Sequence, residues 1–257
     1  MAPRILAIGG SDPSGGAGIQ ADIKTITMLG GYAMTAITAV TVQNTLGVSA
    51  TNPLPAALVG EQIDACLSDI GADAVKIGML GTPETAALVA ARLAHFNGPV
   101  VFDPVMVATN GGILAGDGVR AAFEALISRA TLTTPNLPEL AALGGEAALR
   151  PRARALLIKG GHGEGAEVID RLLTPTGERA FRAPRLETRH THGTGCTLAS
   201  AIATGLGAGL SLEDAVARGI AYVRAALLAA PGYGAGQGPL GHALGRTPID
   251  HLPLGDE

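Results

Sequence analysis

A glycine-rich turn that leads into an apolar helical pattern is the part of this sequence best suited to chemistry. It reads HTHGTGC over residues 190–196, and TLASAI follows it. Free backbone N–H groups at a helix N-terminus converge on one point with the helix dipole behind them, so they form an anion site. We therefore expect Gly193, Thr194 and Gly195 to stabilise the charge that develops on a transferring phosphoryl group.

Cys196 lies in the first turn of that predicted helix. There the helix dipole lowers the pKa of a thiol and favours the thiolate, which could accept a proton from a substrate hydroxyl. The alternative is a small buried apolar side chain, the usual role of a lone cysteine. The only other cysteine, Cys66, has that structural interpretation. The two cysteines form neither a metal-binding pattern nor a disulfide framework, which indicates a reducing compartment.

Charged and polar side chains follow several apolar runs. Lys159 ends one run and precedes two glycines, so it could reach a phosphate, whereas Lys76 is either a second cationic group or a structural one. Asp103, Asn136 and Glu139 follow two further runs and could together hold Mg²⁺, mostly through water. An asparagine before a helix is also a common cap, so each residue alone is unspecific. Their convergence predicts phosphoryl transfer.

A second glycine-rich loop, GGSDPSGGAGIQAD at 9–22, follows the first strand pattern. Residues 16–21 have the G-x-G-x-x-A spacing of a dinucleotide fingerprint, but the pattern starts too far beyond the strand and the acid expected about 20 residues later is missing. No Walker motif occurs either. Asp12 and Asp22 leave two interpretations equally open, a ligand-binding loop and a turn-rich surface connection.

The elements that must position these residues alternate between short β patterns and longer helical ones. This order predicts an α/β fold with a mostly parallel sheet covered by helices on both faces, and ligands beyond the carboxyl ends of the strands. The predicted strands are 4–9, 33–42, 74–77, 99–102, 130–133 and 155–158, with a hairpin at 166–173 and 178–183. The predicted helices are 18–29, 55–69, one from 82, 118–129, a short one after 136, 194–207 and 211–229.

Composition narrows the class of protein further. The chain has 257 residues, 37 of them glycine, with 47% hydrophobic and 16% charged residues, which excludes collagen and disorder. A net charge of −4 without a basic block argues against nucleic acid as a partner. With no signal peptide and no apolar run of the roughly 18 residues that span a membrane, we expect a cytoplasmic protein. We expect one domain over 1–257, with a Gly/Pro-rich tail at 231–257.

Seven motifs, in this order along the chain, resemble those of the hydroxymethylpyrimidine/phosphomethylpyrimidine kinases of thiamine biosynthesis. The resemblance covers about residues 4–210, and GAGQGP at 234–239 fits the C-terminal region of that family. The motifs are IGGSDPSGGAGIQADIKT (8–25), AVTVQNTLGV (39–48), KIGML (76–80), DPVMVATNGG (103–112), TPNLPE (134–139), KGGH (159–162) and THGTGC (191–196).

The resemblance implies a ribokinase-like three-layer α/β fold, usually homodimeric. It implies ATP-dependent phosphorylation of 4-amino-5-hydroxymethyl-2-methylpyrimidine and then of its monophosphate, with Mg²⁺ as cofactor. Gln43 would hydrogen-bond the pyrimidine ring, with Gly10, Ala17, Asp22, Val42 and Met79 around it. Gly193 to Cys196 would form the anion hole, Lys159 would contact the transferring phosphate, and Asp103, Asn136 and Glu139 would order Mg-ATP, Asp103 and Glu139 through water.

Two departures from the family pattern concern the nucleotide side. The segment between the 134–139 motif and the next strand is short, which leaves the adenine contacts unassigned. Thr109-Asn110 stands where relatives often carry Lys-Ser. Pyridoxal kinase remains an alternative because it shares the fold and the glycine turn, although Cys196 and the QNT motif disfavour it. A sugar kinase and a non-enzymatic nucleotide-binding regulator are disfavoured by the same motifs and by the intact anion site.

Overall fold

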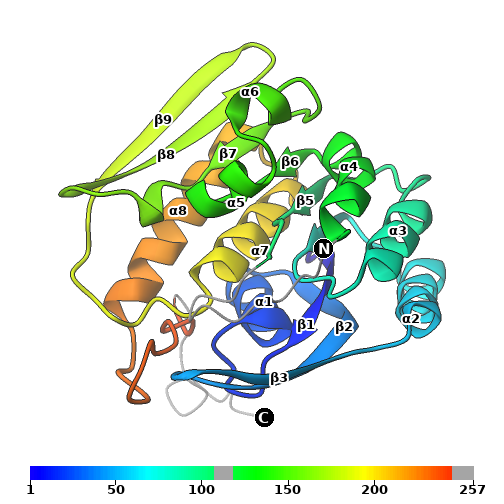
Figure 1. Cartoon of the computed structure of the whole chain (residues 1–257), viewed down its shortest axis with the longest axis horizontal. Coiled ribbons are helices and arrows are strands. Elements are labelled where there is room, and N and C mark those ends of the chain that lie inside the picture. The colour runs from blue at the N-terminus through cyan, green and yellow to red at the C-terminus, as the bar shows by residue number, and fades with distance from the viewer. Residues whose placement is uncertain (107–117, 245–257) are drawn as a thin grey trace, which may run out of the picture.

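Nine strands form one sheet in the computed structural model, which describes residues 1–106 and 118–244 (Figure 1). The order across the sheet is β3-β2-β1-β4-β5-β6-β7-β8-β9. The strands are β1 (Arg4–Ser11), β2 (Tyr32–Asn44), β3 (Gly47–Pro53), β4 (Ala74–Ile77), β5 (Val100–Phe102), β6 (Leu132–Thr133), β7 (Leu156–Ile158), β8 (Glu167–Thr174) and β9 (Gly177–Pro184).

Six neighbouring strands, β2, β1, β4, β5, β6 and β7, run parallel, and antiparallel strands complete both edges. The predicted α/β sheet and the hairpin β8–β9 are therefore confirmed. Because parallel strands end at the same edge, the residues that follow β1, β4, β5, β6 and β7 come together there.

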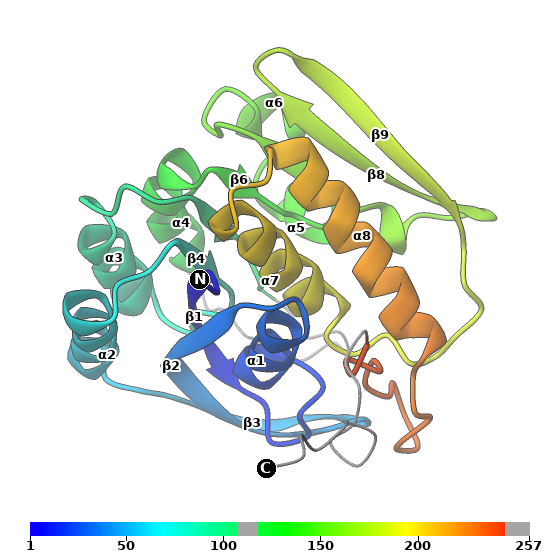
Figure 2. The ribbon, with the colours of Figure 1, turned by 180° about the vertical axis from the view of Figure 1, so that it is seen from behind.

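Helices cover both faces of the sheet, as the two opposite views show (Figures 1 and 2). On one face lie α1 (Gly18–Met28), α7 (Thr194–Gly207) and α8 (Leu212–Leu228). On the other lie α2 (Ala56–Asp69), α3 (Pro83–Arg92), α4 (Val119–Arg129), α5 (Leu137–Ala142) and α6 (Glu146–Leu149). A 3-10 turn, η1, spans Gly160–His162.

Side-chain alternation along β1 divides the core into two layers. Ile5 and Ala7 pack towards α1, α7 and α8, whereas Leu6 and Ile8 pack towards α2, α3 and α4. Successive residues of a strand point to opposite faces, so a strand covered on both sides reads as a continuous apolar run. This explains why such runs predicted the central strands.

The sequence prediction missed β3, which pairs antiparallel with the far half of β2. Its residues are mostly exposed and follow no apolar alternation, so an edge strand of this kind gives little signal. The segment between the 134–139 motif and the next strand is short, as predicted, because only the four-residue α6 stands between α5 and β7. Thr109-Asn110 lies outside the described residues.

The segment 231–244 forms neither helix nor strand, as expected for the described part of the tail. It is nevertheless held in place. Gln237 N donates to Thr45 O at 2.9 Å, and His192 N donates to Gly238 O at 3.1 Å. The tail therefore joins the end of β2 to the glycine-rich turn. Within the residues that the structure describes, no helix is long and apolar enough to cross a membrane.

Candidate active site

A cleft of about 730 Å³ opens at the carboxyl ends of the parallel strands. This volume is in the range usual for small-molecule sites. Residues from seven elements or their following loops meet in its wall, including most of the predicted site residues. These are Gly10 and Ala17 after β1, Gln43 on β2, Met79 after β4, Asp103 after β5, Asn136 and Glu139 after β6, Lys159 after β7, and Gly193, Thr194, Gly195 and Cys196 at α7.

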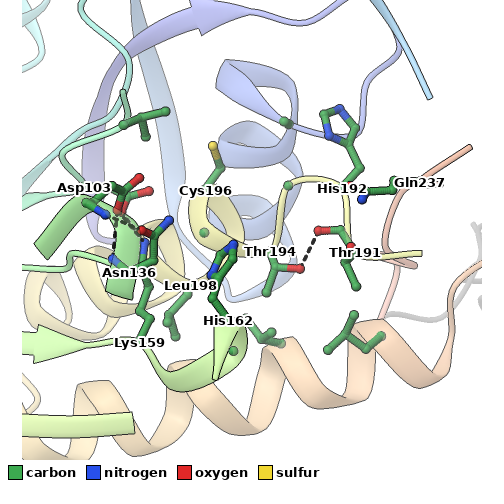
Figure 3. A pocket seen from close by; sticks show the side chains of 18 of the residues that line it. Asp103, Asn136, Lys159, His162, Thr191, His192, Thr194, Cys196, Leu198 and Gln237 are labelled. Carbon is green, nitrogen blue, oxygen red and sulfur yellow. Dashed lines mark hydrogen bonds and ion pairs between the residues drawn. The ribbon is translucent and has the colours of Figure 1, made fainter. Parts of the chain in front are cut away.

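The glycine-rich turn adopts the conformation that an anion site needs. Gly193 is the N-cap of α7 with φ 86°, and a Cβ there would overlap the carbonyl oxygen of Gly16. Glycine is required for both reasons. Thr194 Oγ1 donates to Thr191 O at 2.7 Å, which braces the turn (Figure 3). The first N–H groups of a helix have no acceptor within it, so those of Gly195 and Cys196 are available to an anion.

Cys196 does not have the lowered pKa that the helix N-terminus led us to expect. Burial, opposed by Lys76 and reinforced by Asp22 and Asp103, raises the pKa of its thiol to about 11. The prediction of a resting thiolate was therefore wrong. The dipole of one helix is outweighed by desolvation and by two carboxylates that are remote in the sequence.

We expect alkylation of Cys196 by iodoacetamide to be slow at pH 8 and to reach half of its maximal rate only near pH 11, because only the thiolate reacts and its pKa is about 11. The measurement is the rate of modification against pH, made in a Cys66→Ala background since Cys66 is also a free thiol. A half-maximal rate near pH 7 would contradict the assignment.

Lys159 is held between two carboxylates at the ends of β5 and β6. Its Nζ lies 2.6 Å from Asp103 Oδ1 and 3.8 Å from Glu139 Oε2. Thr134 also donates to Asp103 Oδ1, at 2.9 Å. Burial alone would lower the pKa of Lys159, but the two carboxylates outweigh it and the pKa is raised. The lysine is therefore a fixed positive charge in the cleft.

Asn136 caps a helix, which was the alternative to a role in holding Mg²⁺. Its side chain accepts from Glu139 N, and Glu139 Oε2 accepts from Asn136 N, both at 2.8 Å, which forms a capping box at α5. The cap also fixes the Glu139 carboxyl beside Lys159. Burial and nearby Asp103 raise the pKa of Glu139 to about 7, while Lys159 opposes them.

The acidic pair fits a divalent cation held partly by water. Asp103 accepts its hydrogen bonds through Oδ1, and its Oδ2 faces the backbone of Gly195, where a Cβ would lie 3.2 Å away. Two carboxylates lie beside a single ammonium, so a net negative charge remains when both are ionised. Within 1–106 and 118–244, no three Asp, Glu, His or Cys side chains could hold a metal by themselves. For a cation bound beside Asp103 and Glu139, phosphate and water oxygens would complete the shell.

Asp22 lies beneath the cleft and does not form its wall. Both carboxylate oxygens are 2.9 Å from Lys76 Nζ, and Ser200 Oγ donates to Oδ1 at 2.8 Å. Asp22 and Lys76 are 0% and 1% exposed. Burial raises the pKa of Asp22, and Lys76 and Ser200 oppose it. The pair supports Cys196 and the floor of the cleft from below.

Val42 and Gln43 are neighbours on β2 with different surroundings. Gln43 lines the cleft, whereas Val42 is 60% exposed and lines a shallow hollow between β2 and β3. Side chains alternate along a strand, so two neighbours seldom face one site. Of the six residues expected around the pyrimidine, the structure gathers Gln43, Gly10, Ala17 and Met79 in the cleft.

Sequence reasoning assigned no role to several polar residues of the cleft. Asp12 and His192 form a buried pair, with 2.8 Å between Oδ2 and Nε2. Asp170 accepts from Gly160 N at 2.8 Å and so orients the turn that follows Lys159. Gln237 reaches the cleft from the tail (Figure 3). Asp12 and His192 lie within the motifs 8–25 and 191–196, and this was the signal in the sequence that could have indicated a role for them.

Comparison with known proteins gives consistent matches. The family model described as phosphomethylpyrimidine kinase matches residues 12–241. A hydroxymethylpyrimidine/phosphomethylpyrimidine kinase of Rhizobium meliloti is 46% identical over 256 residues, covering 92% of this chain and 96% of the relative.

Two solved structures share the fold. Pyridoxal kinase from Staphylococcus aureus in complex with AMP-PCP and pyridoxal has a TM-score of 0.86 at 31% identity, covering 95% of this chain and 94% of that one. Phosphomethylpyrimidine kinase from Clostridium difficile has a TM-score of 0.76 at 35% identity, covering 87% and 99%.

Proposed function

The chain belongs to the phosphomethylpyrimidine kinase family, and from that premise we propose how its cleft works. The enzyme is a phosphotransferase of thiamine biosynthesis that phosphorylates 4-amino-5-hydroxymethyl-2-methylpyrimidine and then its monophosphate. ATP is the phosphate donor, and both substrates occupy the same cleft. The fold is ribokinase-like, as in the structures it resembles.

One observation carries the proposal. The anion-binding turn and the fixed lysine meet at one point, since a Cβ at Gly195 would lie 3.4 Å from Lys159 Nζ. A phosphoryl group between them would contact helix N–H groups on one side and an ammonium on the other. Phosphoryl transfer needs chiefly such positioning and charge stabilisation.

The pyrimidine fits the end of the cleft formed by Gln43 and Met79. The glutamine amide supplies one donor and one acceptor for the ring nitrogen and the exocyclic amine. Cys196 lines the same cleft in the first turn of α7, and we propose that it receives the hydroxymethyl proton. Because the thiol is protonated at rest, we propose that it takes up this proton only through a thiolate formed in the substrate complex.

The nucleotide fits the other end. There, β8, β9 with the loop that follows it, and α8 provide an apolar wall for an adenine ring, made of Val168, Phe181, Ala183, Leu186, Ile220, Val223 and Leu227. Asp103 and Glu139 would hold Mg²⁺ through water beside the phosphates, and the metal would neutralise charge on the transferring group. Asn136 would act through its cap on Glu139.

We also propose a homodimer in the cytoplasm, each chain being one kinase domain with one continuous sheet. Val40 and Val42 on β2 and Leu46 in the turn between β2 and β3 support the dimer, because they are 47%, 60% and 69% exposed. Apolar side chains grouped in this way are typical of interfaces. The molar mass in solution from light scattering tests this assembly, and a monomer at micromolar concentration would contradict it.

Release of ADP with four candidate acceptors tests the function. We expect turnover with the hydroxymethylpyrimidine and with its monophosphate, and at most weak turnover with pyridoxal and ribose. Pyridoxal is the second candidate because a pyridoxal kinase covers 95% of this chain with a TM-score of 0.86. Turnover of pyridoxal alone would favour that alternative, and no turnover of either pyrimidine would overturn the proposal.

A further inference from the structure

The Gln43 amide belongs to a closed ring of polar groups at the edge of the cleft. His192 Nε2 lies 2.8 Å from Asp12 Oδ2 and 3.3 Å from the near end of the amide. The far end of the amide lies 3.2 Å from Thr41 Oγ1, and Thr41 Oγ1 donates to Ser11 O at 3.0 Å. Because Ser11 and Asp12 are consecutive, β1 anchors both ends of the ring.

The proton on His192 is determined by Asp12. This carboxyl is 2% exposed and accepts hydrogen bonds from Ser14 and from Ala17 N. Burial alone would raise its pKa, but these bonds and the one from His192 outweigh it, so the pKa lies below its usual value. An ionised carboxylate only accepts, so His192 Nε2 carries a hydrogen and donates it to Asp12.

The two ends of the amide are then distinguishable. An NH₂ group beside His192 would place two donors face to face, so the near end must be the oxygen. At the far end, the single hydroxyl proton of Thr41 goes to Ser11 O, so Thr41 Oγ1 accepts from an amide N–H. With its oxygen towards His192 and its nitrogen towards Thr41, the amide oxygen shares the single Nε2–H of His192 with Asp12, and no two donors face each other in the ring.

We propose that Asp12, acting through His192, holds the Gln43 amide in this polarity, and that the polarity selects pyrimidines with an amino group over those with an oxo group beside the ring nitrogen. This inference rests on the function proposed above. Asp12 and His192 are positioning residues, because they act on the substrate through Gln43. The ring leaves the amide one oxygen lone pair and one N–H for the ligand.

The free lone pair and N–H match only one of the two pyrimidine types. In an aminopyrimidine the exocyclic amine donates to Oε1, and the ring nitrogen accepts from Nε2. In the corresponding oxo compound the ring N–H donates and the oxygen accepts, so the amide would have to turn over. Turning it over faces two donors at His192. Where a site is fully built to hydrogen-bond its substrate, leaving such buried groups unpaired lowers kcat/KM for the wrong compound by about 10⁴-fold. For the aminopyrimidine relative to the oxo compound we expect a ratio of kcat/KM values of at least about 10².

The test compares kcat/KM for the aminopyrimidine and for its 4-oxo analogue, with Mg-ATP, in the wild type and in Asp12→Asn. The asparagine amide can donate to His192 Nε2, which moves the histidine proton to Nδ1. The Gln43 amide can then turn over without placing two donors face to face. We expect the ratio of the two kcat/KM values to fall at least tenfold, mainly through KM. His192→Phe removes the donor altogether and should narrow the ratio in the same way, so it serves if Asp12→Asn does not fold.

Ser14→Ala is the matched control, since it removes a bond to Asp12 but leaves the Asp12–His192 contact in place. We expect it to leave the ratio unchanged. If Asp12→Asn lowers activity on both compounds equally, Asp12 only supports its loop and the inference is overturned. A wild type that turns over the aminopyrimidine with no preference overturns it too. A wild type inactive on both pyrimidines instead overturns the proposed function.

Discussion

Replacement of Lys159 by alanine is expected to lower kcat for both pyrimidine substrates about 10³-fold. Removing one preorganised donor from a developing negative charge costs about 10² to 10³ in kcat. The alanine variant also loses the cation between Asp103 and Glu139, which lie 2.6 and 3.8 Å from Lys159 Nζ. Two carboxylates without that charge between them would repel the phosphates as well. The effect therefore falls on kcat more than on KM for the pyrimidine.

Cys196→Ser is the comparison variant for this experiment. A thiol with a pKa of about 11 is protonated at rest, so its loss removes less transition-state stabilisation than loss of a full charge. We expect a decrease of about 10- to 10²-fold in kcat, at the low end of what a positioned acid–base group contributes, because the serine hydroxyl can still exchange a proton. Steady-state kinetics on both variants, with circular dichroism to confirm folding, gives the ranking. A larger loss in kcat for Cys196→Ser than for Lys159→Ala would mean that proton transfer contributes more to catalysis than charge stabilisation by Lys159.

The sequence was sufficient to predict the sheet and the edge at which the site lies. Apolar runs that end in Asp103 or Lys159 predicted parallel strands, and the shared direction of such strands brings these residues together. The hairpin β8–β9 was also predicted, because a Pro-Thr-Gly turn separates two β patterns. Local sequence patterns were enough to place a residue at the site wherever its position depends only on the strand that it follows.

Roles that depend on remote neighbours were not predictable in this way. The raised pKa of Cys196 comes from burial and from Asp22 and Asp103, which no local pattern connects with it. Gln43 and His192 are 149 residues apart and meet only because β2 ends and α7 begins at the cleft. Their chemistry follows from the tertiary fold.

The buried pair of Asp22 and Lys76 carries the second large prediction, and here the effect is on stability. Lys76→Met is expected to lower the free energy of unfolding by about 3–5 kcal/mol, because it leaves the Asp22 carboxyl buried without its counter-ion. Chemical denaturation at pH 7, followed by circular dichroism, measures this. Asp22→Leu should cost a similar amount, since it leaves an ammonium unpaired instead.

The double variant Asp22→Leu/Lys76→Met separates the charge effect from a packing effect. With both charges gone, no unpaired ion remains, so we expect its loss to be well below the sum of the two single losses. A loss equal to that sum would mean that the two side chains act independently.

The pH dependence of the stability of Lys76→Met gives a further test of this prediction. Burial already raises the pKa of Asp22, and without Lys76 nothing but Ser200 opposes it. A carboxyl whose pKa is higher in the folded than in the unfolded state binds more protons when folded, so it favours folding at low pH. The variant should therefore lose stability as the pH rises from about 4 through the folded-state pKa of Asp22. Stability that increases over this range would show that the carboxylate finds another cation in the variant.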